Sequence, residues 1–181
     1  MIVEILSVGY GVMAMIGWGL GDVLTKKVVG HVGYYRLLVY TQLVGLAPVF
    51  VLTAVSGLPM PSSLTTIALI VGTGICSASA MLFFYKGLEV GRASIVTPVV
   101  STSAIVSIAL SFAILGETLS LPQAACIAMT FGGVLIITMR ARSGRSSGTG
   151  ISYALGAMVA AGLNAILIKL VSVETGAIGA L

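Results

Sequence analysis

A pair of opposite charges stands near the end of the first apolar run of this chain. Asp22 and Lys26 are four residues apart with the acid first, so the two side chains can pair along one face of a helix. If this run lies in a membrane, the charges are costly and contact with a substrate or ion is one interpretation. Near the membrane interface, however, a self-neutralising pair or a Lys that extends toward water is ordinary. The spacing leaves both interpretations open.

Uncharged residues in other apolar runs could also contact a solute. Trp18 could form a wall of a binding cavity, or it could be a packing or interfacial Trp. Pro98 removes a backbone donor and bends a helix, so Thr97 and Ser101 beside it could offer hydroxyls to a polar solute. Small-residue packing between helices explains the same hydroxyls. Asn164 is either an interhelical hydrogen-bonding residue or a cavity contact.

The composition places these residues in a membrane. The chain is 58% hydrophobic and 8% charged, whereas soluble domains are about 25% charged. Its apolar runs reach about 20 residues, enough to cross a hydrocarbon core ~30 Å thick. The sequence therefore predicts a multi-pass protein of the cytoplasmic membrane that is surrounded by lipid bilayer.

Several other functions have no support in the sequence. The net charge of +4 reflects Lys and Arg in loops, and without a basic patch interleaved with aromatics we expect no nucleic-acid partner. Cys76 and Cys126 lie deep in apolar runs, which favours small core residues over a disulfide or a metal site. HExxH, P-loop and Ser/His/Asp patterns are missing. We expect no enzymatic activity, no cofactor and no metal.

The apolar runs predict an all-α membrane protein with six transmembrane helices. Gly17 and Gly21 form a GxxxG pair in the first helix that suits close contact with a neighbouring helix. A loop is expected around Gly30, His31 and Gly33. The predicted helices cover residues 5–24, 34–55, 64–85, 93–115, 121–138 and 151–171, with a capping box at the start of the fifth, where Ser120 stands three residues before Gln123.

The first helix has a partial copy near the C-terminus of the chain. Shifting the numbering by 143 aligns Tyr10 with Tyr153, Ala14 with Ala157, Met15 with Met158, Gly19 with Gly162, Leu20 with Leu163, Leu24 with Leu167, Lys26 with Lys169, Val28 with Val171 and Gly33 with Gly176. Ungapped agreement in so short a window indicates an internal repeat. Because an odd number of helices separates the two copies, the second must enter the membrane in the opposite direction. Secondary transporters use such inverted repeats and bind substrate between the halves.

The repeat divides the chain into three parts. Residues 1–138 form a first five-helix repeat, residues 139–150 an Arg/Gly/Ser-rich linker, and residues 151–181 the truncated start of a second repeat. Two complete units of 143 residues would need about 290 residues, so we expect a partial chain. The partners expected from this organisation are a small-molecule solute and either a second copy of the chain, as a homodimer, or the missing second-repeat segment.

The positive charges predict an orientation. Every Lys and Arg except Lys169 lies by one membrane face. Cytoplasmic loops carry an excess of these residues. We therefore expect the N-terminus outside and the Arg-rich linker in the cytoplasm.

Several stretches together resemble a known family. They are Trp18-Gly19 followed by Lys26, then YKGLEVGRASIVTPVV (85–100), LGETLSLPQ (115–123) and FGGVLII (131–137). In this order and spacing, over residues 8–171, the chain resembles an EamA-type domain of the drug/metabolite transporter superfamily. The resemblance implies a ten-helix fold of two inverted five-helix repeats that moves small metabolites by alternating access. Glu117 is similar to the Gly-Glu pair that follows the fourth helix in the family, although support of the next helix N-terminus explains it more simply.

The sequence therefore predicts a secondary transporter of a small organic metabolite or drug-like solute. If the first helices of the two repeats meet across a pseudo-twofold axis, the solute cavity should be bordered by Trp18, Asp22, Thr97, Ser101 and Asn164, with Lys26 as a further candidate contact. The alternative is a non-transporting membrane module, or a fragment, whose helices only pack with partner helices.

Overall fold

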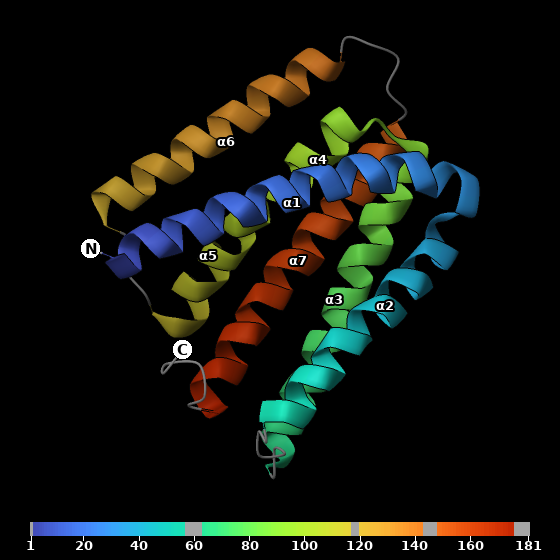
Figure 1. The fold of residues 1–181 in the computed structure, drawn as a ribbon. Coiled ribbons are helices and arrows are strands. Elements are labelled where there is room, and N and C mark those ends of the chain that lie inside the picture. Colours follow the sequence, from blue (N-terminus) through green and yellow to red (C-terminus); the bar gives the residue numbers. More distant parts are fainter. Residues whose placement is uncertain (1, 57–62, 117–119, 143–147, 176–181) are drawn as a thin grey trace.

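The structure is a computed structural model that describes residues 2–56, 63–116, 120–142 and 148–175. All of its regular elements in these ranges are helices, arranged as Figure 1 shows. Their bounds are α1 Ile2–Val32, α2 Tyr34–Ser56, α3 Leu64–Val90, α4 Ala93–Ser101, α5 Ser103–Leu115, α6 Leu121–Arg142 and α7 Gly148–Thr175.

The helices have the length and composition of membrane spans. Within the described residues, five segments are long and apolar enough to cross a membrane, with α4 and α5 together forming one of them. Helix α6 adds a shorter apolar stretch, Leu121–Ile136. This agrees with the predicted all-α membrane protein of six transmembrane helices.

Helices α1 and α3 run past the ends that the sequence suggested. Helix α1 continues through Gly30 and His31, where a loop was predicted, and only Gly33 separates it from α2. Gly33 has φ +83°, a left-handed conformation that glycine adopts without steric cost. Helix α3 likewise continues through Lys86 to Val90. The charged residues near these ends did not stop either helix. A helix still satisfies the backbone hydrogen bonds of charged residues, and the apolar residues between them pack against neighbouring helices.

The predicted fourth helix is interrupted. Thr102 separates α4 from α5 with φ −78° and ψ 3°. Its backbone N–H donates to Val99 O at 3.2 Å, a tighter i→i−3 bond than the α-helical one, and its hydroxyl also reaches Val99 O. Pro98, four residues earlier, already lacks a backbone donor inside α4. The bend expected near Thr97-Pro98 is thus an interruption one turn further on.

The ends of α6 and α7 extend into the predicted linker. Helix α6 reaches Arg142 and α7 begins at Gly148, so residues 143–147 are the part of the linker outside the described residues. Glu117 also lies outside them. At the start of α6 the capping box is half formed, since Gln123 Oε1 accepts from the Ser120 backbone N–H at 3.0 Å and from the Ser120 hydroxyl at 2.9 Å.

One end of the bundle is tightly packed. Val29, Leu88 and Ile95 are at most 1% exposed there and come from α1, α3 and α4. The rest of this core comes from the same helices and from α2 and α7: Leu38, Tyr85, Val96, Val99 and Ala154. Toward the other end the helices diverge (Figure 1). The charged turns between α1 and α2 and between α3 and α4 therefore border the packed end.

Helix α7 packs most extensively against α3, and the two lie side by side in Figure 1. Glycines make the closest approach between them. A Cβ built on Gly150 would lie 2.7 Å from the Gly91 Cα, and one on Gly87 would lie 3.5 Å from the Tyr153 Cβ. Small residues allow membrane helices to approach in this way. In the middle of α3 the approach is looser, since a Cβ built on Gly72 would lie 3.9 Å from the Leu167 Cδ1 of α7 and one on Gly74 would meet nothing within 4 Å.

Candidate functional site

A cavity of about 340 Å³ lies between α1, α3, α4 and α7 and takes in the start of α5. Trp18 and Asp22 reach it from α1, Thr97 and Ser101 from α4, and Asn164 from α7. The structure thus brings five of the six candidate site residues to one place. The remaining lining residues are Ser77, Ala80, Met81, Phe84, Val100, Ser103 and Ala161.

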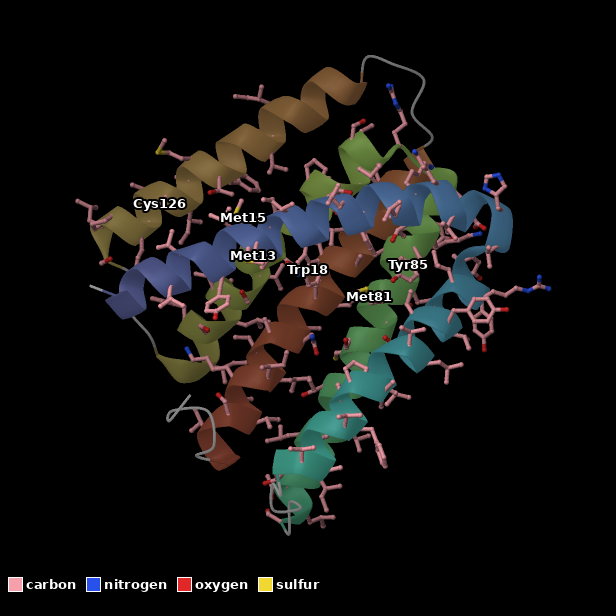
Figure 2. All side chains as sticks on the ribbon, viewed as in Figure 1. Met13, Met15, Trp18, Met81, Tyr85 and Cys126 are labelled. Carbon is pink, nitrogen blue, oxygen red and sulfur yellow. The ribbon has the colours of Figure 1, made fainter. Side chains whose placement is uncertain are left out.

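Helical spacing explains why these residues share the cavity. Residues three or four apart lie on one face of a helix. Trp18 and Asp22 are four apart, as are Thr97 and Ser101, while Ala161 and Asn164 are three apart. Each helix therefore turns one short face toward the cavity. In Figure 2, Trp18 of α1 and Met81 of α3 are labelled close to each other where these two helices approach.

A polar atom of the cavity is left without a partner. Thr97 Oγ1 and Asn164 Oδ1 are both buried; Thr97 Oγ1 interacts with the Asp22 carboxyl, whereas Asn164 Oδ1 has no hydrogen bond within the described residues. A buried polar atom without a partner costs about 1–3 kcal/mol. The Asp22 carboxyl faces the Thr97 side chain from α1. For Asn164, the absence of a partner within the described residues favours the cavity interpretation over interhelical hydrogen bonding.

Ser101 takes a smaller part in the cavity than its neighbours. Its hydroxyl donates to Thr97 O at 2.9 Å, one turn back on the same helix, and its side chain is exposed. This bond satisfies the hydroxyl hydrogen and leaves the oxygen as an acceptor. Ser101 therefore borders the cavity without an unmet donor.

Lys26 lies outside the group that lines this cavity. Its ammonium donates to Leu88 O and, at 2.7 Å, to Gly91 O at the C-terminal end of α3. The last carbonyls of a helix lack intrahelical donors and favour a cation. Lys26 thus attaches the end of α1 to the junction of α3 and α4. Its spacing from Asp22 suggested a charged pair, but the contacts of its ammonium are with these backbone oxygens instead.

A second cation is held at the same end of the bundle. Lys86 of α3 pairs with Glu89 at 2.6 Å, and its Nζ lies 4.4 Å from the centroid of the Tyr34 ring at the start of α2. A cation over an aromatic face is attracted by the ring. Lys26 and Lys86 therefore join α1, α2 and α3 at the packed end of the bundle.

Gly17 and Gly21 of α1 do not make the close contact with a neighbouring helix that we predicted. A Cβ on Gly17 or Gly21 would meet no described atom within 4 Å. Both glycines instead line a second hollow of about 420 Å³ between α1 and α3, which Trp18 and Asp22 also border. Helix α1 contacts its neighbours near its C-terminal end, where Val29 is buried. Gly17 and Gly21 lie further toward the N-terminus and therefore do not pack closely against another helix.

Helix α3 also contributes to the cavity, although the sequence did not suggest it. Met81 and Phe84 provide apolar side chains, and Ser77 adds a hydroxyl. Ser77 and Met81 are four residues apart and Met81 and Phe84 are three apart, which was the available signal. Cys126 is also placed differently from the prediction, because its side chain is exposed on α6 rather than buried in the core (Figure 2). Cys76 is half-buried.

Comparison with known proteins identifies the family. A model of the EamA-like transporter family matches residues 5–139. The chain belongs to the EamA-like transporter family. No curated protein and no solved structure matches it.

Membership of the EamA-like family carries part of the functional conclusion. The family is one of membrane transporters, so the chain is a multi-pass membrane protein of a small-solute transporter family. The match covers α1 to α5 and most of α6, whereas α7 lies beyond it. Asn164 and Ala161 therefore come to the cavity from outside the matched segment. That α7 begins an inverted second repeat stays a prediction.

Proposed function

We propose that this chain is part of a secondary carrier that moves a small organic metabolite or drug-like solute across the cytoplasmic membrane. The observation that carries the proposal is the cavity itself. Trp18, Asp22, Thr97 and Asn164 come from three helices that are distant in sequence, and the buried Asn164 Oδ1 lacks a partner among the described residues. A solute with hydrogen-bonding groups would satisfy this oxygen.

The proposed mechanism is alternating access around this cavity. The packed core and the Lys26 contacts close the bundle at the end where α3 meets α4. The interruption at Thr102 supplies a point where α4 and α5 can change their relative direction. Rocking of two repeats would open the cavity to one face of the membrane and then to the other, without a nucleotide.

The positive-inside rule supports the proposed orientation. Lys26, Lys27, Arg36, Lys86 and Arg92 all belong to the end of the bundle where α1 meets α2 and α3 meets α4. This end would face the cytoplasm, and the N-terminus would lie outside. With Cys76 and Cys126 replaced by Ser, an impermeant thiol reagent on intact cells should label Ser7→Cys and not Ser147→Cys. Labelling of the Ser147 site alone would reverse the orientation.

The rival function is a membrane module that packs with partner helices and transports nothing. The exposed apolar side chains along α1 favour this rival function, since Tyr10, Met15 and Trp18 are each at least 67% exposed. A carrier differs from such a module in binding solute at the cavity. Binding at Thr97 and Asn164 is therefore the property to measure.

Trp18 makes this measurement direct, because it is the single Trp of the chain and lines the cavity. Purified chain in detergent would be titrated with 2-phenylethylamine, 2-phenylethanol and 3-phenylpropionate while Trp emission is recorded. We expect a saturable change with at least one probe that Asn164→Leu and Thr97→Val weaken and that Thr130→Val of α6, which does not line the cavity, leaves unchanged. Absence of a saturable change with all three probes would contradict the proposed site.

A further inference from the structure

The charge of the cavity is one-sided. Of the described residues that line it, Asp22 is the one with an ionisable acid or base, so the cavity carries a formal negative charge when this carboxyl is ionised. A carboxylate removed from water is costly unless a cation or hydrogen-bond donors compensate it. An anionic solute would add a second negative charge beside it. The cavity therefore favours a positively charged occupant.

The nearest basic residues are held by other groups. The Lys26 ammonium donates to Leu88 O of α3 and to Gly91 O, directly after the end of α3. Lys86 is paired with Glu89 and lies against the Tyr34 ring. Both contacts orient these ammonium groups toward the packed end of the bundle. They leave the side of Asp22 that faces the cavity open to a ligand.

The oxygens around the cavity suit one ammonium group. Asp22 supplies carboxylate oxygens, and Asn164 Oδ1 is a buried acceptor that lacks a partner among the described residues. Thr97 Oγ1 is buried beside the Asp22 carboxyl and keeps lone pairs that can accept a further hydrogen bond. A primary ammonium carries three N–H donors and no acceptor. One such group could donate to all three side chains, which come from α1, α4 and α7.

Apolar side chains also line the cavity. They include Trp18, Met81 and Phe84, against which an aliphatic or aromatic body would pack. Aromatic faces also attract a cation that lies above them. The cavity volume of about 340 Å³ is at the lower end of the range for small-molecule sites, about 300–1,000 Å³.

From these observations we infer that the solute is an organic cation, a protonated amine on a compact apolar body. The ammonium binds between Asp22, Thr97 and Asn164, and the apolar body contacts Trp18 and Phe84. The inference rests on the proposed function and specifies its substrate class.

The test uses the same three probes, which share a phenyl body and differ in charge. In the Trp18 emission titration, 2-phenylethylamine should bind about tenfold or more tightly than the neutral 2-phenylethanol, and the anionic 3-phenylpropionate more weakly still. Asp22→Asn, which keeps the shape of the side chain, should remove the preference for the amine over the alcohol. Glu89→Gln is the matched control, because it removes a carboxyl outside the cavity and should leave the preference intact.

A second variant tests the same assignment if Asp22→Asn does not fold. Asn164→Leu removes one acceptor without changing charge, and it should weaken amine binding more than alcohol binding. If the alcohol or the anion binds as tightly as the amine, or if Asp22→Asn keeps the preference, the cation assignment is overturned while the cavity remains a solute site. If no probe gives a saturable change, the proposed function fails and the assignment fails with it.

Discussion

Helices α1 and α7 carry matching residues at a constant offset of 143 positions but make different contacts. In α7, the Tyr153 ring lies 6.4 Å from the Phe83 ring, and Ala157 is completely buried. The matching residues of α1 are open, with Tyr10 67% exposed. The same pattern of small and large residues is therefore packed in one helix and unpacked in the other.

The difference in packing between α1 and α7 follows from the number of helices around each. Helix α7 has α3, α4 and α5 around it, whereas α1 contacts α2, α3 and α4 near its C-terminal end. Membrane helices associate by close packing of small residues rather than by burying apolar surface. On the predicted repeat, the exposed face of α1 would pack against a second set of helices like α3 to α5, in a second repeat or in a second copy of this chain.

The largest effect is expected from matched glycine substitutions. A Cβ at Gly162 would lie 2.5 Å from the Val106 Cβ and 3.0 Å from Ser103 O, whereas one at Gly19 would meet nothing within 4 Å. Gly162→Leu should destabilise the chain by about 3 kcal/mol or more, since neither the backbone nor a β-branched residue can move away easily. Gly19→Leu should leave the folded yield and melting temperature in detergent nearly unchanged. Equal losses for both variants would show that α1 is packed like α7.

A smaller effect is expected at the end of α1. Lys26→Met keeps the side-chain length but removes the donor to Leu88 O and Gly91 O. We expect a loss of about 1–2 kcal/mol in unfolding free energy, because the last carbonyls of α3 lose a charged partner. Lys27→Met changes an exposed side chain and is the control for charge alone. A melting temperature that falls equally in both variants would assign the effect to charge rather than to the contact.

The smallest effect concerns the interruption between α4 and α5. Thr102 Oγ1 donates to Val99 O at 2.5 Å and lies 3.1 Å from the Met158 sulfur of α7. Thr102→Val should cost about 1 kcal/mol by removing this buried bond. Thr130→Val of α6 changes an exposed side chain, loses a similar bond to Cys126 O of its own helix, and should cost less. Urea or thermal unfolding in detergent that ranks the two variants in reverse order would contradict the contact with α7.

Sequence predicts the spans and the cavity residues more readily than the helix ends. The length of each apolar run determines whether it can span the membrane. A spacing of three or four residues determines which side chains share a helix face, as for Trp18 and Asp22. The extension of α1 to Val32 depends on Val29 packing into a core formed by other helices, which local sequence does not reveal. The contact of Lys26 with α3 likewise depends on where the end of α3 lies in space. For Gly17 and Gly21, a GxxxG pattern indicates the capacity for close contact but not the presence of a neighbour.

The most direct test of a carrier with its site in this cavity is solute uptake by proteoliposomes. Benzylguanidine is a suitable probe, because a guanidinium stays charged at neutral pH and crosses lipid slowly. We predict saturable uptake by vesicles that contain the chain, above that of protein-free vesicles, and a loss of that uptake in Asn164→Leu but not in Thr130→Val. If benzylguanidine changes Trp18 emission but vesicles take up no more of it than protein-free ones do, the chain binds solute without carrying it, and the carrier function is contradicted.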